Sequence, residues 1–295
     1  MRFSSRIHLA ALIVGSAFHA QASAIVQGAV FQNPDDTDFT QGHTIYNSPV
    51  NIGSPVNDTI SWSFDCGTSC AGYDISGNGA AKVINGSLGA VSSVTVTGAP
   101  GGAHYLGEAN SYAQYDDTLT ITGGTGTGVL ELQYMLDGNA TSSGTGFNLS
   151  FSYLAIFGAV GATYSLDGGA ITSGQQVTFS GNGAKSDTVT FYVPFTYGTQ
   201  LSIEPIVRTA ANFYQDYDST PYTATWDFYN TATLTSALVL DGTANNPGSV
   251  VNAASIAAAS GLGYGPNGIS ATPEPSTIVL LSSTLGALIF MRRRR

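Results

Sequence analysis

The clearest strand pattern in the chain is Tyr222-Thr-Ala-Thr-Trp-Asp-Phe228, followed closely by Ala232-Thr-Leu-Thr-Ser-Ala-Leu-Val-Leu240. Apolar and hydroxyl-bearing side chains alternate along it, and a period of two places them on opposite faces of a β-strand. Its aromatic, Val and Thr residues also favour strands over helices. The stretch therefore predicts strands with one face in a core and the other in water.

Segments with the same period recur along the chain and are separated by turn signals such as Asp137-Gly-Asn, Asp167-Gly-Gly and Asp241-Gly. These segments are residues 59–64, 93–97, 118–122, 129–134, 147–153, 162–166, 176–179, 188–193 and 201–203. Many short strands separated by such turn residues are typical of an all-β fold. We expect a single β-sandwich or jelly-roll-like domain over residues 25–250, flanked by a signal peptide and a C-terminal sorting helix.

Two local patterns add expectations about the chain between the strands. The motif Ser-Gly-Asn-Gly-Ala occurs at 76–80 and again at 180–184, and we expect two similar turns that arose independently. The Ala-rich piece from Asn252 to Ser260 is the one stretch inside the body that predicts a short helix. It lies in residues 251–272, which we expect to be a linker.

Charge is scarce in this chain. Charged residues make up 9% of it, against about 25% in an ordinary soluble domain. Residues 25–272 hold three basic residues, Lys82, Lys185 and Arg208, and eighteen acidic ones, so their net charge is −15. Binding to phosphate backbones needs clustered Lys and Arg, so this composition excludes nucleic acid as a partner.

The N-terminus has the three parts of a secretory signal peptide. Arg2 and Arg6 precede the apolar stretch 9–18, and Ala22-Ser-Ala24 offers the small-x-small pattern that signal peptidase cleaves. We therefore expect residues 1–24 to be removed and the mature chain to begin at Ile25.

Export determines how the two cysteines are interpreted. Cys66 and Cys70 are separated by three residues, and the chain has no other cysteine. In an oxidising compartment such a pair forms a disulfide, which we predict here. Two free thiols or a metal clip remain alternatives, although a zinc site needs further Cys or His ligands.

The C-terminus combines a stiff motif, an apolar run and a basic end. Pro273-Glu274-Pro275 precedes the mostly apolar run 276–291, which as a helix is ~24 Å long. The chain then ends in four consecutive arginines, Arg292, Arg293, Arg294 and Arg295. Arg is costly at the centre of a membrane helix, so this cluster predicts a stop to translocation that leaves the body outside.

This tail resembles the PEP-CTERM sorting signal of Gram-negative bacteria that make exopolysaccharide. The resemblance implies an exported protein that exosortase, a membrane-embedded cysteine protease, processes near Pro273-Glu274-Pro275. The stretches 193–203 and 226–234 are similar to the closing strands of β-sandwich proteins in that family. In such a sandwich Trp226 and Phe228 point inward and Asn230 caps a bend.

No arrangement of residues indicates catalysis. The mature chain has only His43 and His104 as possible bases, and no Gly-x-Ser-x-Gly elbow. A glycosidase needs two acids close together, and the candidates are Glu108, Glu131, Asp116, Asp117 and Glu204. Asp35, Asp36 and Asp38 could supply oxygen ligands to a structural calcium ion, and solvated loop acids are the simpler interpretation. We expect no other cofactor.

These observations predict a non-catalytic surface or extracellular-matrix protein associated with exopolysaccharide or biofilm. Its expected partners are signal peptidase, exosortase during sorting, and exopolysaccharide. Anchoring in the inner membrane by the C-terminal helix is expected to be transient, before release to the cell surface or matrix. A carbohydrate-binding, lectin-like module of the same fold is the alternative, because exposed Tyr and Trp can stack on sugar rings. A polysaccharide-active hydrolase is a third.

Overall fold

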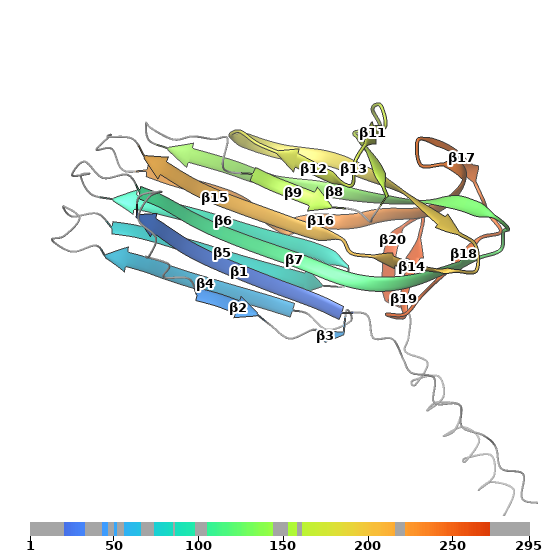
Figure 1. Ribbon diagram of the computed structural model, residues 1–295, viewed down its shortest axis with the longest axis horizontal. Helices are drawn as coiled ribbons and strands as arrows, with labels where there is room; N and C mark the ends of the chain where they lie inside the picture. Colours follow the sequence, from blue (N-terminus) through green and yellow to red (C-terminus); the bar gives the residue numbers. More distant parts are fainter. Residues whose placement is uncertain are drawn as a thin grey trace, which may run out of the picture.

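The computed structural model describes residues 21–32, 43–46, 50–51, 56–65, 74–84, 86–97, 105–143, 153–157, 161–215 and 222–271. Strands dominate these residues, and no helix occurs among them. Every pairing between strands is antiparallel. The predicted all-β class is therefore confirmed (Figure 1).

The first sheet has nine strands, with β7 as its longest member. Its central path, in spatial order, is β12 (Gln176–Phe179), β9 (Tyr153–Phe157), β15 (Ile206–Gln215), β7 (Tyr105–Thr122), β1 (Gln21–Gln32) and β2 (His43–Tyr46). Two further strands pair with β7, namely β14 (Gln200–Ile203) and β18 (Ser255–Ala258), while β3 (Val50–Asn51) pairs with β1.

The second sheet also has nine strands. Its spatial order is β11 (Thr172–Ser173), β10 (Thr163–Leu166), β13 (Gly183–Thr196), β8 (Thr127–Ser143), β16 (Tyr222–Thr243), β6 (Ser87–Thr97), β5 (Asp74–Ile84) and β4 (Val56–Asp65), with β17 (Asn246–Val250) paired to β16. A hairpin of β19 (Leu262–Gly265) and β20 (Gly268–Ala271) lies at one end of the two sheets (Figure 1).

The inner faces of the two sheets meet, and a buried cluster of hydroxyls joins them. Ser92 of β6 lies 2.8 Å, Oγ to Oγ1, from Thr209 of β15 and donates to Ser111 of β7 at 3.2 Å. Elsewhere between the two sheets, the hydroxyls of Tyr115 on β7 and Tyr134 on β8 lie 3.1 Å apart. Polar groups buried this deeply need partners, so these bonds fix the alignment of one sheet on the other.

The alternation that predicted the strand at 222–228 sets which side chains fill the core. Trp226 and Phe228 are 2% and 0% exposed, as expected, and their rings stack with centroids 6.1 Å apart. Between them Asp227 is exposed. In this part of β16 the inner face is thus aromatic, whereas Asp227 on the outer face is polar.

Three predicted turns are wrong, because the residues lie inside strands; one of them, Asp241-Gly, belongs to β16 and precedes the turn at residues 244–245. Residues 76–80 belong to β5, where Gly77 and Gly79 are buried, and only 180–184 contains a turn, in which Gly181 and Gly183 have positive φ. Asp137-Gly-Asn belongs to β8. A Cβ at Gly138 would come close to the Asp227 carbonyl and the Phe228 ring, so glycine there permits a close strand contact rather than a turn.

The predicted short helix and linker near the C-terminus are also wrong for residues 255–271. They form β18, β19 and β20, and β18 pairs with β7 from Ser255 opposite Thr122 to Ala258 opposite Leu119. Leu262 and Tyr264 are buried. Ala favours a helix locally, but the unpaired side of β7 offers backbone hydrogen bonds and burial that outweigh this preference.

A β-bulge in β16 raises Tyr229 toward the outer face. Phe228 pairs with Ala90 of β6 whereas Ala232 pairs with Leu88, so the intervening residues have no partner in that ladder. A Cβ at Gly89 would collide with the backbone of Tyr229. The bulge therefore depends on the missing side chain at position 89.

We expect Gly89→Ala to lower the free energy of unfolding by about 1–3 kcal/mol, because the added methyl meets rigid backbone. Denaturant unfolding of the mature protein measures this loss. Gly265→Ala is the matched control, since a Cβ at Gly265 meets nothing within 4 Å. Equal stability of the two variants would contradict the proposed dependence of the bulge on Gly89.

Candidate functional site

Most of the sites predicted from the sequence lie outside the described residues. They are the sorting motif Pro273, Glu274 and Pro275, the cluster Arg292 to Arg295, the cysteines Cys66 and Cys70, and the calcium candidates Asp35, Asp36 and Asp38. The disulfide, the metal site and the sorting signal therefore stay predictions. Both cysteines lie in the connection of the β4–β5 hairpin, between Asp65 and its partner Asp74.

The predicted signal-peptidase site falls within a strand. Ala22 and Ala24 belong to β1 and pair with Tyr115 and Ala113 of β7. Cleavage after Ala24 would leave Ile25, which pairs with both Tyr46 and Tyr112, as the first residue of the strand. The rest of the ladder, through Gln32, remains in the mature chain.

Two of the five candidate glycosidase acids come together on the outer face of the first sheet. The side-chain amide of Gln114 donates to Asp116 Oδ1 at 3.0 Å and to Glu204 Oε1 at 2.6 Å. Because one nitrogen bonds both oxygens, they are at most about 6 Å apart, which is compatible with the ~5–5.5 Å between the two acids of retaining glycosidases. However, the amide of Gln114 lies between the two carboxylates and bonds both, so a protein group occupies the space that a sugar would need.

The remaining acids do not join this pair. Asp117 points into the core, because neighbouring residues of a strand face opposite ways. Glu131 lies on β8 of the other sheet, where burial raises the pKa of its carboxyl. Glu108 and His43 are described only by their backbone pairing, and His104 lies outside the described residues.

Asp117 is the centre of a buried polar network that sequence reasoning missed. It is 2% exposed and accepts hydrogen bonds from Ser260 Oγ at 2.6 Å, Tyr264 OH at 2.8 Å, and the backbone amides of Thr118 and Ser260 at 2.8 and 3.2 Å. Burial, and then the charge of Asp117, raises the pKa of Tyr264 well above its usual value. Tyr264 therefore stays a neutral donor and holds β19 against β7.

Two further tyrosines continue the network between the sheets. Burial raises the pKa of Tyr115 and of Tyr134 well above the usual value, so both hydroxyls remain protonated. Their side chains are fully buried and the Tyr134 ring packs edge-on against Phe191, with centroids 6.3 Å apart. The network is therefore a structural anchor that joins the two sheets.

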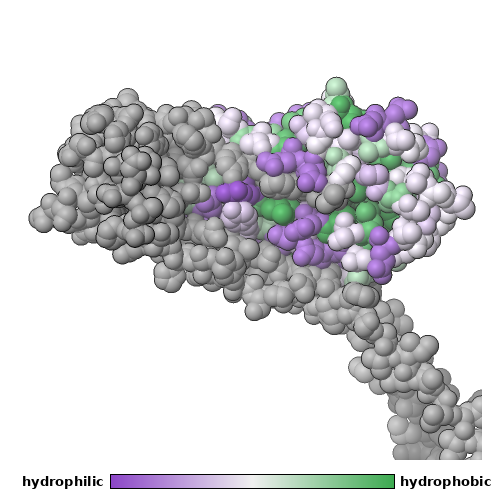
Figure 2. Space-filling model, viewed as in Figure 1, coloured by the Kyte–Doolittle hydropathy of each residue, from purple (hydrophilic) through white to green (hydrophobic). Residues whose placement is uncertain are grey.

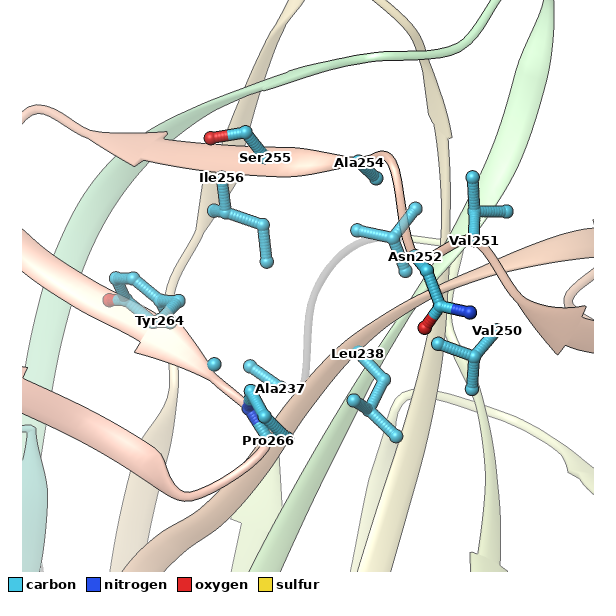
Figure 3. A pocket seen from close by; sticks show the side chains of 12 residues that line it. Ala237, Leu238, Val250, Val251, Asn252, Ala254, Ser255, Ile256, Tyr264 and Pro266 are labelled. Atoms are coloured by element: carbon cyan, nitrogen blue, oxygen red, sulfur yellow. The ribbon is translucent and has the colours of Figure 1, made fainter.

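A hollow of about 470 Å³ lies beside this anchor. It is bordered by β16, by the turn after β17, and by β18 and β19; Figure 3 shows the aliphatic side chains of Leu238, Val251 and Ile256 around it. Tyr264 also lines it, but its hydroxyl is committed to Asp117. No acid, His, Lys or Arg lines the hollow, so it offers no acid–base chemistry.

Two of the three basic residues of the body lie over tyrosine rings. The Lys82 ammonium is 4.2 Å from the centroid of Tyr229, and the Arg208 guanidinium is 4.8 Å from that of Tyr112. Figure 2 shows hydrophilic and hydrophobic residues in small interspersed groups on the face in view. Basic residues are thus dispersed over the described surface and form no anion-binding patch.

The described ranges contain neither a metal-binding cluster nor a membrane-spanning helix. No three His, Cys, Asp or Glu side chains there gather closely enough to hold a metal ion. No helix in the same ranges is long and apolar enough to cross a membrane.

Comparison with protein-family models, with curated proteins and with solved structures finds no match for this chain.

Proposed function

We propose that this chain is an exported, non-catalytic protein of the cell surface or extracellular matrix, with a β-sandwich body that an exosortase-type protease sorts through the C-terminal tail. The tail resembles a PEP-CTERM signal in its Pro-Glu-Pro motif, apolar run and terminal arginines. Association with exopolysaccharide follows from that resemblance and belongs to the same proposal.

The observation that carries the proposal is how close the described strands come to the motif. The last described strand, β20, finishes at Ala271, and Pro273 begins the motif two residues later. The Asp117 network and the pairing of β18 with β7 hold the residues before it in place. A processed chain that starts at Ile25 and loses the tail would therefore keep residues 25–32 of β1 and every described strand from β2 to β20.

The polar character of the outer faces supports a role outside the cell. Thr, Ser, Asn and Gln supply most of this polarity, and the mature segment carries only 21 ionisable Asp, Glu, Lys and Arg residues. Hydroxyls and amides keep such a surface hydrated without attracting nucleic acid. This surface suits contact with neutral hydrated material.

The experiment is fractionation of a native host with and without its exosortase. With the protease, we expect the chain at the surface or in the medium, starting at Ile25 and lacking Arg292 to Arg295. Without it, we expect the full tail and a membrane-bound protein. Intact mass and cell fractionation measure both. A chain that keeps Arg295 in both strains would show that the tail is a plain anchor.

A further inference from the structure

A row of hydroxyls crosses four strands on the outer face of the second sheet. Ser76 of β5 pairs with Thr95 of β6, Thr95 with Thr223 of β16, and Thr223 with Ser143 of β8. The inward neighbours Val94, Tyr222 and Ala224 are buried, whereas the four row residues are partly or fully exposed. The row therefore presents its hydroxyls to the outside.

A second row runs beside the first, two residues further along each strand. Asn78 pairs with Ser93, Ser93 with Thr225, and Thr225 with Thr141. The hydroxyls of Ser93 and Thr225 are 2.9 Å apart, and Thr223 Oγ1 donates to Thr95 Oγ1 at 3.5 Å in the first row. These bonds across strands restrict the rotamers, so the hydroxyls are held in position before any ligand arrives.

The two rows form a regular lattice without charge. Neighbouring strands lie ~4.8 Å apart and alternate residues of one strand ~7 Å apart, so the eight polar groups repeat at these spacings. A pyranose residue in an extended polysaccharide advances the chain by about the distance between strands. Successive sugars laid across the strands would therefore meet successive hydroxyls of one row.

The bulge in β16 bounds this lattice. Asp227 follows Thr225 on the outer face, and its Oδ1 accepts from the Tyr229 amide at 3.2 Å. Tyr229 lies beyond Asp227, and the Lys82 ammonium lies over its ring, 4.2 Å from the ring centroid. The bulge, which Gly89 makes possible, thus places an aromatic side chain beside the rows. Bulges commonly re-aim side chains next to binding sites.

We propose that these two rows, the hydroxyl lattice, bind an extended neutral polysaccharide, a proposal that rests on the proposed function for its exopolysaccharide partner. The lattice offers donors and acceptors that match sugar hydroxyls, and Tyr229 offers an apolar edge. Neutrality follows from charge: the body carries −15, which repels an anionic polysaccharide, and none of the eight row residues is a cation.

Affinity electrophoresis of the processed protein tests the proposal, with hydroxyethylcellulose and dextran as neutral probes and alginate as the anionic one. We expect a neutral gel to retard the protein and alginate not to. Thr95→Val/Thr223→Val/Thr225→Val should weaken binding about tenfold or more, since three hydrogen-bonding hydroxyls are lost. The matched control, Thr118→Val/Thr120→Val/Thr122→Val on β7 of the other sheet, should bind like wild type.

Asn78→Ala provides a second variant, because Asn78 is exposed and its loss leaves the core untouched. We expect it to weaken binding about threefold or more. Three outcomes would overturn the proposal: no retardation on either neutral probe, retardation on alginate alone, or equal losses of binding in the two triple variants. Sorting of the variants in the host is measured separately from binding. A row variant that reaches the surface normally but binds more weakly would support this inference independently of the proposed function.

Discussion

Replacing Asp117 by Ala should lower the free energy of unfolding by about 3–4 kcal/mol. The substitution removes the acceptor of the Ser260 and Tyr264 hydroxyls and of the Ser260 amide. Each polar group left unsatisfied in the interior costs roughly 1–3 kcal/mol. Denaturant unfolding of the processed protein measures the total loss.

The loss should be concentrated in residues 255–271. The Asp117 network joins Ser260 and Tyr264 to β7, so hydrogen exchange in β18 and β19 should accelerate more than exchange in β8 or β13. Asp117→Asn keeps one acceptor oxygen and should lose less, about 1–2 kcal/mol.

Asp116→Ala is the control for this experiment, because it removes the adjacent acid of the same strand. Asp116 is partly exposed and bonds only to the Gln114 amide in its described contacts. A change within about 0.5 kcal/mol is expected. If the two alanine variants lost the same stability, the buried network would not be what anchors the C-terminal strands.

Replacing both Pro273 and Pro275 by Ala should convert the protein from a released form to an uncut, membrane-bound one in a native host. Proline restricts its own φ and biases the residue before it away from the helical region. The two prolines would therefore keep the motif extended, and Ala would allow the helix of 276–291 to grow toward the cut site. The tail should then retain Arg292 to Arg295 in an intact-mass measurement.

The position of β20 sharpens this expectation. Only residue 272 separates Ala271, the end of the last described strand, from Pro273. A protease that reads this motif must therefore act close to β20, so a motif drawn into a helix should become inaccessible to it. Pro266→Ala, in the β19–β20 turn, is the matched control and should be processed like wild type. Normal processing of the double variant would show that the prolines do not present the site.

The fold class could be predicted because alternation is a local property. Residues 176–179, 188–193 and 222–228 all lie in strands with the expected periodicity, and Trp226 and Phe228 face the core. Side chains of a strand must alternate between two faces, so the alternation of apolar and polar residues is visible in residues that are neighbours in the sequence. It can be recognised without knowing the rest of the chain.

Errors arose where distant residues override local preference. Gly77, Gly79 and Gly138 look like turn residues but lie in β5 and β8, and Gly138 is required by the close approach of β16. The Ala-rich residues before Ser260 look helical but complete the ladder of β7. In each case a partner more than sixty residues away or on another strand supplies the deciding contact.

Residue type and local spacing are enough to predict the all-β class, the inward side chains of the strands and the uneven distribution of charge. Strand pairing, in contrast, is what buries Asp117 and leaves Asp116 outside the core. It also makes Asp116 and Glu204 share Gln114 and aligns hydroxyls from four strands in rows. These features depend on strand register, which backbone pairing between distant segments sets and which a shift of a single residue would reverse.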